Sequence, residues 1–94
     1  MTQPFTGPVA LEIEQRLRAA LAPDHLVVTN DSARHRGHAG DDGSGESHFT
    51  VELVSERFEG MSRVERQRAV NMALADLLRD HIHALAIKAR APGE

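Results

Sequence analysis

Histidine is the residue of this chain best suited to chemistry, because imidazole is the commonest protein ligand for metal ions. Two stretches concentrate it: the glycine-rich segment 31–49, DSARHRGHAGDDGSGESHF, and the short segment 81–83, HIH. The spacings H-x-x-H and H-x-H can both chelate a metal. The histidines concerned are His35, His38, His48, His81 and His83. They can form a metal site, supply half of a site that a partner completes, or remain solvated surface groups.

His83 has the strongest case within this set. It shares a predicted strand face with Leu85 and Ile87, so we expect its ring to be partly covered at the rim of a sheet. A covered imidazole needs either a hydrogen-bond partner or a metal. The sequence leaves both interpretations open: His83 is either a structural histidine with a hydrogen-bond partner or a metal ligand.

The absence of cysteine limits the metal chemistry that the chain can perform alone. It excludes a disulfide, a cysteine-ligated zinc site and an iron–sulfur site held by four thiolates of this chain. The formal net charge of −3 and the pI of about 6.0 disfavour nucleic acid as a partner, because phosphate binding usually needs a basic excess. Without a signal-peptide pattern or a long apolar stretch, we expect a cytoplasmic protein with no membrane partner.

Two further patterns in the glycine-rich segment carry weaker hypotheses. GHAG (37–40) and GDDG (40–43) match the G-x-x-G clamp of KH nucleic-acid domains, but they stand between strands and carry aspartates that repel phosphate. Ser47 and His48 are residue types that occur in the catalytic triad of hydrolases, yet nothing in the sequence indicates a nucleophile elbow or an oxyanion hole. We therefore expect loop flexibility from the glycines and no enzymatic activity.

A basic cluster, RVERQR, begins a predicted helix and contains Arg63, Arg66 and Arg68. Basic groups in the first turns of a helix oppose its dipole, which is mildly unfavourable. The cluster can be a solvated face or a docking surface for an acidic partner, with nucleic-acid phosphate as the weaker alternative. Lys88 can join the same patch.

The first half of the chain predicts one helix and two strands. Apolar residues recur at steps of four from Val9 to Leu21, which indicates an amphipathic helix that starts at Pro8 and that Pro23 stops. The β-branched segment 25–30 predicts a strand. The polar stretch 31–46 predicts a long loop, and the alternation in 47–55 predicts a half-buried strand. These two strands should form an antiparallel hairpin.

The second half predicts a turn, a helix and a final strand. Gly60 marks the turn, and Ser62 and Glu65 have the spacing of a capping box. A helix over 63–79 should bury Val70, Ala73, Leu74, Leu77 and Leu78. Little polarity on either face of 81–91 predicts a central or covered strand.

The predicted order is therefore helix–strand–strand–helix–strand, an α+β fold with a three-stranded sheet and helices packed on one face. At 94 residues the chain has room for one domain. We assign residues 1–7 to a flexible leader and residues 8–92 to a single domain.

Several spaced motifs together resemble the BolA family. They are the S-H-F strand opening (Ser47–Phe49), the S-x-R-F-x-G-x-S stretch (55–62), the R-x-R pair (Arg66 and Arg68) and H-A-L-A (83–86). The resemblance runs from about residue 9 to residue 92. It implies a class II KH-like α+β fold, which agrees with the predicted order of elements.

The resemblance also implies a partner and a cofactor. BolA-like proteins pair with monothiol glutaredoxins, and a [2Fe–2S] cluster can bridge the two chains. The glutaredoxin then contributes its cysteine and the thiol of bound glutathione. The BolA-like chain contributes the histidine of H-A-L, here His83, and a ligand from the loop between the first strands. In the histidine-type branch that ligand follows S-x-x-H, which Ser32–His35 fits, with His38 as the neighbouring alternative and His48 as a possible accessory.

The sequence departs from the family pattern at two places. The loop is longer than usual and lacks the customary proline-containing tail, and Gln67 stands where a histidine is common. Some family members are described as DNA-binding transcription regulators. The expectation is thus a non-enzymatic adaptor in iron–sulfur cluster trafficking or iron homeostasis, a monomer or weak dimer alone, with a nucleic-acid-binding regulator as the alternative.

Overall fold

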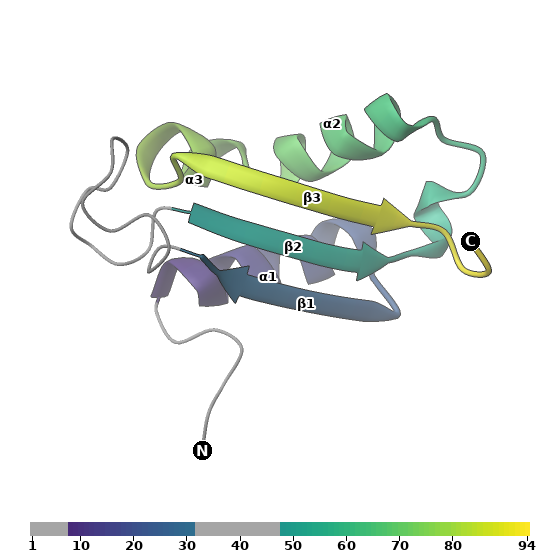
Figure 1. Cartoon of the computed structure of the whole chain (residues 1–94), viewed down its shortest axis with the longest axis horizontal. Helices are drawn as coiled ribbons and strands as arrows, with labels where there is room; N and C mark the ends of the chain where they lie inside the picture. The colour runs from purple at the N-terminus through teal and green to yellow at the C-terminus, as the bar shows by residue number, and fades with distance from the viewer. Residues whose placement is uncertain (1–7, 32–47) are drawn as a thin grey trace, which may run out of the picture.

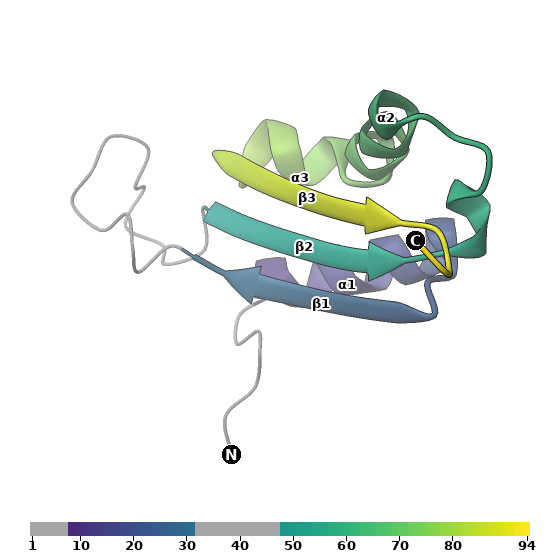
Figure 2. The ribbon, with the colours of Figure 1, turned by 45° about the vertical axis from the view of Figure 1, so that its right-hand side comes forward.

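The computed structural model describes residues 8–31 and 48–94 and places three strands in front of a layer of helices (Figure 1). The same layering is visible after rotation of the molecule (Figure 2). In chain order the elements are α1 (Pro8–Leu21), β1 (His25–Asn30), β2 (His48–Val54), the 3₁₀ turn η2 (Glu56–Phe58), α2 (Arg63–Ala73), α3 (Ala75–Asp80) and β3 (Ala84–Arg90). The predicted α+β class, with a three-stranded sheet and helices on one face, is confirmed.

The sheet has the order β1–β2–β3, so β2 is its central strand. β1 and β2 are antiparallel, with Asn30 opposite Phe49 and His25 opposite Val54, which confirms the predicted hairpin. β2 and β3 are parallel, because the chain crosses over through α2 and α3 between them. The prediction of a central or covered last strand is wrong: among the described residues β3 is an edge strand beside β2, and its residues alternate between exposed and partly buried.

The core lies between the sheet and the helices. Phe49, Val51 and Leu53 alternate along β2 and are all buried, as the sequence pattern predicts. The predicted stripe of α1 faces them through Ile13 and Leu17, both fully buried. The remaining buried apolar residues are Ala10, Leu21, Val28, Phe58, Val70, Leu74, Leu77, Ile82 and Ala91.

The helix predicted over 63–79 is divided in two. α2 ends at Ala73 and α3 begins at Ala75, with Leu74 between them at φ −110° and ψ 16°. No proline or glycine marks the position; instead, Leu74 is fully buried, and its N–H is shared between the carbonyls of Val70 and Asn71. The bend lets α2 and α3 each direct a separate apolar face at the sheet. Among the described helices, none is long and apolar enough to cross a membrane.

Hydrogen bonds fix the connection between β2 and α2. The predicted capping box is confirmed: the Glu65 N–H donates to Ser62 Oγ at 3.1 Å, and the Ser62 N–H donates to Glu65 Oε1 at 2.7 Å. Gly60 has φ +79°, the left-handed conformation that favours glycine in the predicted turn. Sequence patterning did not indicate the fully buried Ser55, whose Oγ donates to the Leu21 carbonyl at 2.6 Å and accepts from the Arg57 N–H at 3.1 Å.

Replacing Ser55 with alanine should destabilise the fold more than removing the helix cap. Ser55→Ala leaves the buried Leu21 carbonyl without its donor, which costs about 2 kcal/mol. Ser62→Ala exposes backbone N–H groups that water can reach, and costs about 1 kcal/mol. The free energy of unfolding of each variant is measured by urea denaturation at unchanged m-value. An equal or larger loss for Ser62→Ala would contradict the proposed role of Ser55.

Candidate functional site

Two histidine rings meet at one end of the sheet. The imidazoles of His48 and His83 lie with their centroids 6.2 Å apart and their planes inclined by 18°. The sheet register explains this proximity, because His48 at the start of β2 stands opposite Ala84 at the start of β3, and His83 precedes Ala84 directly. The parallel pairing of β2 and β3 thus brings together two segments far apart in the sequence.

The burial of the two rings differs from the sequence-based expectations. His83 is exposed, not partly covered, because it precedes β3 and the predicted strand over 81–91 begins only at Ala84. The alternation of the strand places His48 on the face opposite to Phe49, Val51 and Leu53, yet it is only 7% exposed, because its strand is central and the His83 ring lies over it. His81 is the C-terminal cap residue of α3, and its N–H donates to the Leu77 carbonyl at 2.8 Å.

The segment that carries the predicted loop ligands begins and ends beside this histidine pair. The Asp31 N–H donates to the His48 carbonyl at 2.7 Å, and the Thr50 hydroxyl donates to the Asp31 carboxylate. His35 and His38 themselves lie outside the described residues. A shallow cavity of about 220 Å³ opens at the same end of the sheet, lined by Asp31, His48, Phe49, Ala84, Leu85 and Ala86.

The histidine pair can supply nitrogen ligands but not a complete coordination shell. Within residues 8–31 and 48–94, no group of three or more histidine, cysteine, aspartate or glutamate side chains is placed to hold a metal ion. The ligating nitrogens of two imidazoles on one metal stand roughly 3–4 Å apart, since each bond is ~2 Å long. The exposed His83 ring can change rotamer to approach another donor, whereas the buried His48 ring is held in place. A metal ion bound to these two rings would need further ligands from elsewhere.

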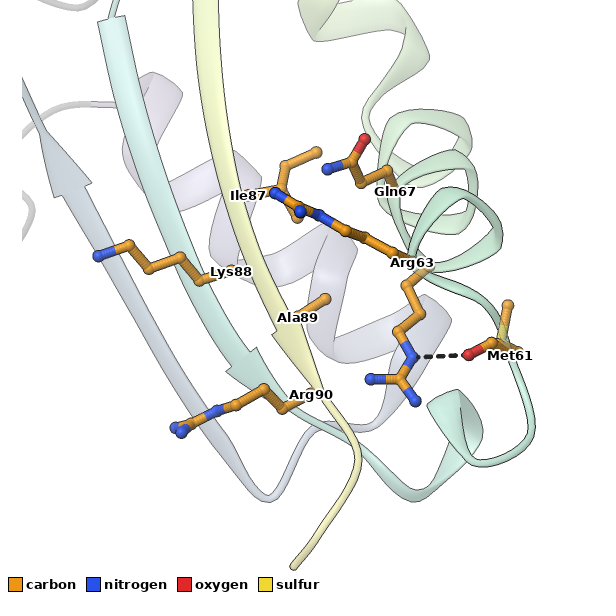
Figure 3. Close-up of a pocket in the computed structure, with 8 residues that line it drawn as sticks. Met61, Arg63, Gln67, Ile87, Lys88, Ala89 and Arg90 are labelled. Atoms are coloured by element: carbon orange, nitrogen blue, oxygen red, sulfur yellow. Dashed lines mark hydrogen bonds between the residues drawn. The ribbon is translucent and has the colours of Figure 1, made fainter. Parts of the chain in front are cut away.

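A second feature is a groove of about 460 Å³ between α2 and the outer edge of β3. Figure 3 shows Arg63 and Gln67 extending from α2 toward β3, while Lys88 and Arg90 extend from β3 to the opposite side. Ile87, Ala89 and Met61 supply apolar surface. We call this feature, lined by Met61, Arg63, Arg66, Gln67 and residues 87–90, the basic groove.

The basic groove contains three of the four residues predicted as a docking surface. Arg63, Arg66 and Lys88 line it, whereas Arg68 does not. Sequence reasoning missed Arg90, although its spacing of two from Lys88 in a strand places both on one face. Among the described residues, neither Arg63 nor Lys88 has an ion-pair partner within 4 Å.

Arg66 is already engaged by a carboxylate. Its guanidinium donates two hydrogen bonds to the Glu94 carboxylate, one of them at 2.7 Å, and its Nε donates to the Met61 carbonyl at 3.1 Å. Glu94 also accepts from the Ala91 N–H at 3.1 Å. These hydrogen bonds, chiefly those from Arg66, lower the pKa of Glu94 from 4.5 to about 2. Arg66, one of the residues that line the groove, thus binds a carboxylate of this chain.

The comparison with known proteins assigns the family. Residues 17–94 match the sequence model of the BolA family, described as BolA-like protein. The chain belongs to the BolA-like family. The resemblance noted in the sequence is therefore confirmed, and the family match covers both the histidine pair and the basic groove.

Relatives of this BolA-like chain come from distant organisms. It is 48% identical over 88 residues to BolA-like protein 1 of Homo sapiens, covering 94% of this chain and 61% of that protein. It is 49% identical over 75 residues to a protein of Vibrio cholerae named DNA-binding transcriptional regulator BolA, covering 80% and 67%. The solved structure of BolA1 from Arabidopsis thaliana superposes with a TM-score of 0.81 at 36% identity, covering 95% and 98%. The fold is thus that of solved family members.

The pKa of Glu94 should depend on Arg66. A carboxylate whose folded pKa is about 2 and whose unfolded pKa is 4.5 contributes stability that is fully present above pH 4.5 and is lost as the pH falls through 2. We expect carbon-detected NMR titration of the Glu94 carboxyl to show the low pKa. In Arg66→Gln it should rise toward 4.5, whereas Arg68→Gln, outside the groove, should leave it low. An unchanged pKa in Arg66→Gln would contradict the assigned cause.

Proposed function

We propose that the chain is a non-enzymatic adaptor that binds a monothiol glutaredoxin and supplies histidine nitrogens to a [2Fe–2S] cluster shared between the two proteins. The observation that carries the proposal is the exposed His83 ring above the buried His48, at the sheet end where the segment 32–47 is attached. Membership of the BolA-like family supports the adaptor role. We further propose that it acts in the cytoplasm, in cluster trafficking or iron homeostasis, and is a monomer or weak dimer alone.

The available donors suit a shared cluster. This chain has imidazoles but no thiolate, so a partner must supply the sulfur ligands, namely the glutaredoxin cysteine and the thiol of its bound glutathione. Two histidines on one iron and two thiolates on the other form the ligand set of Rieske centres, in which histidine raises the reduction potential. The cluster would supply electron-transfer chemistry and would itself be the group passed on in cluster trafficking. His83 would hold it in an orientation that the sheet fixes.

Chain length supports a loop histidine as the second ligand. Asp31 and Ala84 flank His48 on neighbouring strands, so they lie about two strand spacings, or roughly 10 Å, apart. The four-residue step from Asp31 to His35 spans at most about 14 Å when extended. His35 is therefore within reach of His83, and His38, farther along the same segment, is also within reach. His48 remains the accessory candidate because its buried ring already contacts His83.

A DNA-binding regulator is the second candidate. The basic groove favours it, and a relative from Vibrio cholerae carries that function in its name. The net charge of −3 opposes it, because nonspecific affinity for DNA comes from neutralised phosphates. The proposed adaptor function therefore ranks first.

Loss of the His83 imidazole should abolish cluster sharing. The purified chain is mixed with glutathione-loaded glutaredoxin that carries its cluster, and visible absorption and circular dichroism are recorded. The wild-type chain should change the cluster spectrum and form a 1:1 heterodimer. His83→Ala should leave the glutaredoxin spectrum unchanged, because one iron loses one of its two nitrogen ligands. His25→Ala, which removes an exposed histidine at the other end of the sheet, should behave like the wild-type chain.

The loop ligand is identified by the same assay with His35→Ala, His38→Ala and His48→Ala. We expect His35→Ala to resemble His83→Ala, and His38→Ala to retain the spectral change. A wild-type spectrum for His83→Ala would refute the cluster proposal.

Gel shifts with duplex DNA at rising salt test the second candidate function. If the chain binds all DNA sequences alike, at micromolar or weaker affinity, only the nonspecific electrostatic interaction remains and a DNA-binding regulator is excluded.

A further inference from the structure

We propose that the free edge of β3, together with the basic groove, binds an extended acidic peptide segment of a partner protein as a fourth strand of the sheet. This surface runs along β3 away from the histidine pair, with Leu85 at the end nearest to that pair, and does not depend on the proposed cluster chemistry. Strand addition of this kind takes its affinity from main-chain hydrogen bonds and its specificity from alternate side chains.

The backbone of β3 offers hydrogen-bonding groups on its outer side. Within the described residues, β3 has β2 as its only strand neighbour. The Arg90 carbonyl accepts from the Ser55 N–H at 3.0 Å, so Arg90 directs its main-chain groups toward the β2 side. Successive residues of a strand alternate in this direction. Ala89, Ile87 and Leu85 therefore direct their N–H and C=O groups outward, to the open edge.

The same residues form the apolar part of the groove. Ile87 and Ala89 are partly buried on the helix side of β3, and both line the basic groove with Met61. A strand placed along this edge would bring alternate side chains over Ile87 and beneath Arg63 and Gln67 of α2 (Figure 3). The groove is therefore matched to a side chain with an apolar stem and an acidic end on that side of the added strand.

Positively charged side chains lie on both sides of the position that an added strand would occupy. Arg63 reaches from α2 on the helix side, while Lys88 and Arg90 extend from β3 on the open face (Figure 3). Acidic side chains on either face of the peptide would therefore meet a cation. Arg66 provides an example of such a contact at one cation of the groove, since its guanidinium holds the chain's own Glu94 carboxylate through two hydrogen bonds.

The charges also select among the possible occupants. Pairing of β3 with β3 of a second copy would place Lys88 and Arg90 near their equivalents, so like-charge repulsion opposes self-association. Nucleic acid can use the cations, but it does not reproduce the alternating donors and acceptors of a peptide backbone along Leu85, Ile87 and Ala89. An acidic extended peptide satisfies both the charges and the edge.

The test uses a fluorescent peptide of about eight residues in which glutamate alternates with valine, a length typical of a strand. Fluorescence anisotropy measures its binding to the full chain at low salt and at about 0.15 M ionic strength. We expect saturable binding that weakens with salt. A peptide with lysine in place of glutamate, and the glutamate peptide with alternate N–H groups methylated, should each bind at least about tenfold more weakly.

Matched double variants separate the groove from the overall charge. Arg63→Gln/Lys88→Gln removes two cations of the basic groove and should weaken peptide binding by about tenfold. Arg68→Gln/Arg79→Gln removes the same charge outside the groove and should leave affinity within about twofold of the wild-type value. His83→Ala should also bind normally, which separates a failure of this proposal from a failure of cluster binding.

Amide exchange monitored by NMR locates the peptide. Binding should slow exchange at the outward amides of Leu85, Ile87 and Ala89 relative to the inward amides of Ala86 and Lys88. Each of the following results would overturn the proposal: equal affinity for the glutamate and lysine peptides, protection elsewhere on the chain, or tighter binding of a single-stranded oligonucleotide that competes away the peptide. If the N-methylated glutamate peptide binds as tightly as the unmethylated one, strand addition is likewise excluded.

Discussion

The structure depends on the pairing of β2 with a strand on each side. The antiparallel partner β1 follows from a local hairpin, whereas the parallel partner β3 requires the crossover through α2 and α3. This arrangement buries Phe49, Val51 and Leu53 against the helices and makes β3 an edge. It also sets the register that puts His48 opposite Ala84, and therefore beside His83. One set of strand pairings thus creates both the core and the two candidate binding surfaces.

The two surfaces occupy different parts of β3 and use different chemistry. The histidine pair lies at the start of the strand, where imidazole nitrogens are available as ligands. The basic groove follows the later residues of the strand, where guanidinium and ammonium groups surround an apolar strip. Because the rigid sheet carries both, a partner that meets one surface can meet the other without distortion of the core. Because the two surfaces are separate, a substitution in the basic groove need not alter the histidine pair, and the reverse also holds.

Each surface leaves binding groups available: the histidine pair has imidazole nitrogens, and the outer edge of β3 has main-chain N–H and C=O groups. Among the described residues, the histidine pair lacks enough ligands for a metal, and the outer edge of β3 lacks a neighbouring strand. The chain's own Glu94 satisfies Arg66, which stabilises the end of the groove through a carboxylate whose pKa is about 2. Within residues 8–31 and 48–94, neither Arg63 nor Lys88 has an ion-pair partner within 4 Å.

The sequence by itself determined the elements whose signals are local. The four-residue apolar steps of α1, the alternation of β2, the Ser62–Glu65 capping box and the turn at Gly60 each depend on neighbours in the chain. It also identified the histidines and most cations of the candidate sites, because residue type limits chemistry. Tertiary structure decided the rest. The break at Leu74 accompanies the full burial of that residue in the core. The edge position of β3 and the stacking of the buried His48 with the exposed His83 depend on which strand lies on each side of β2, a long-range choice that local periodicity does not encode.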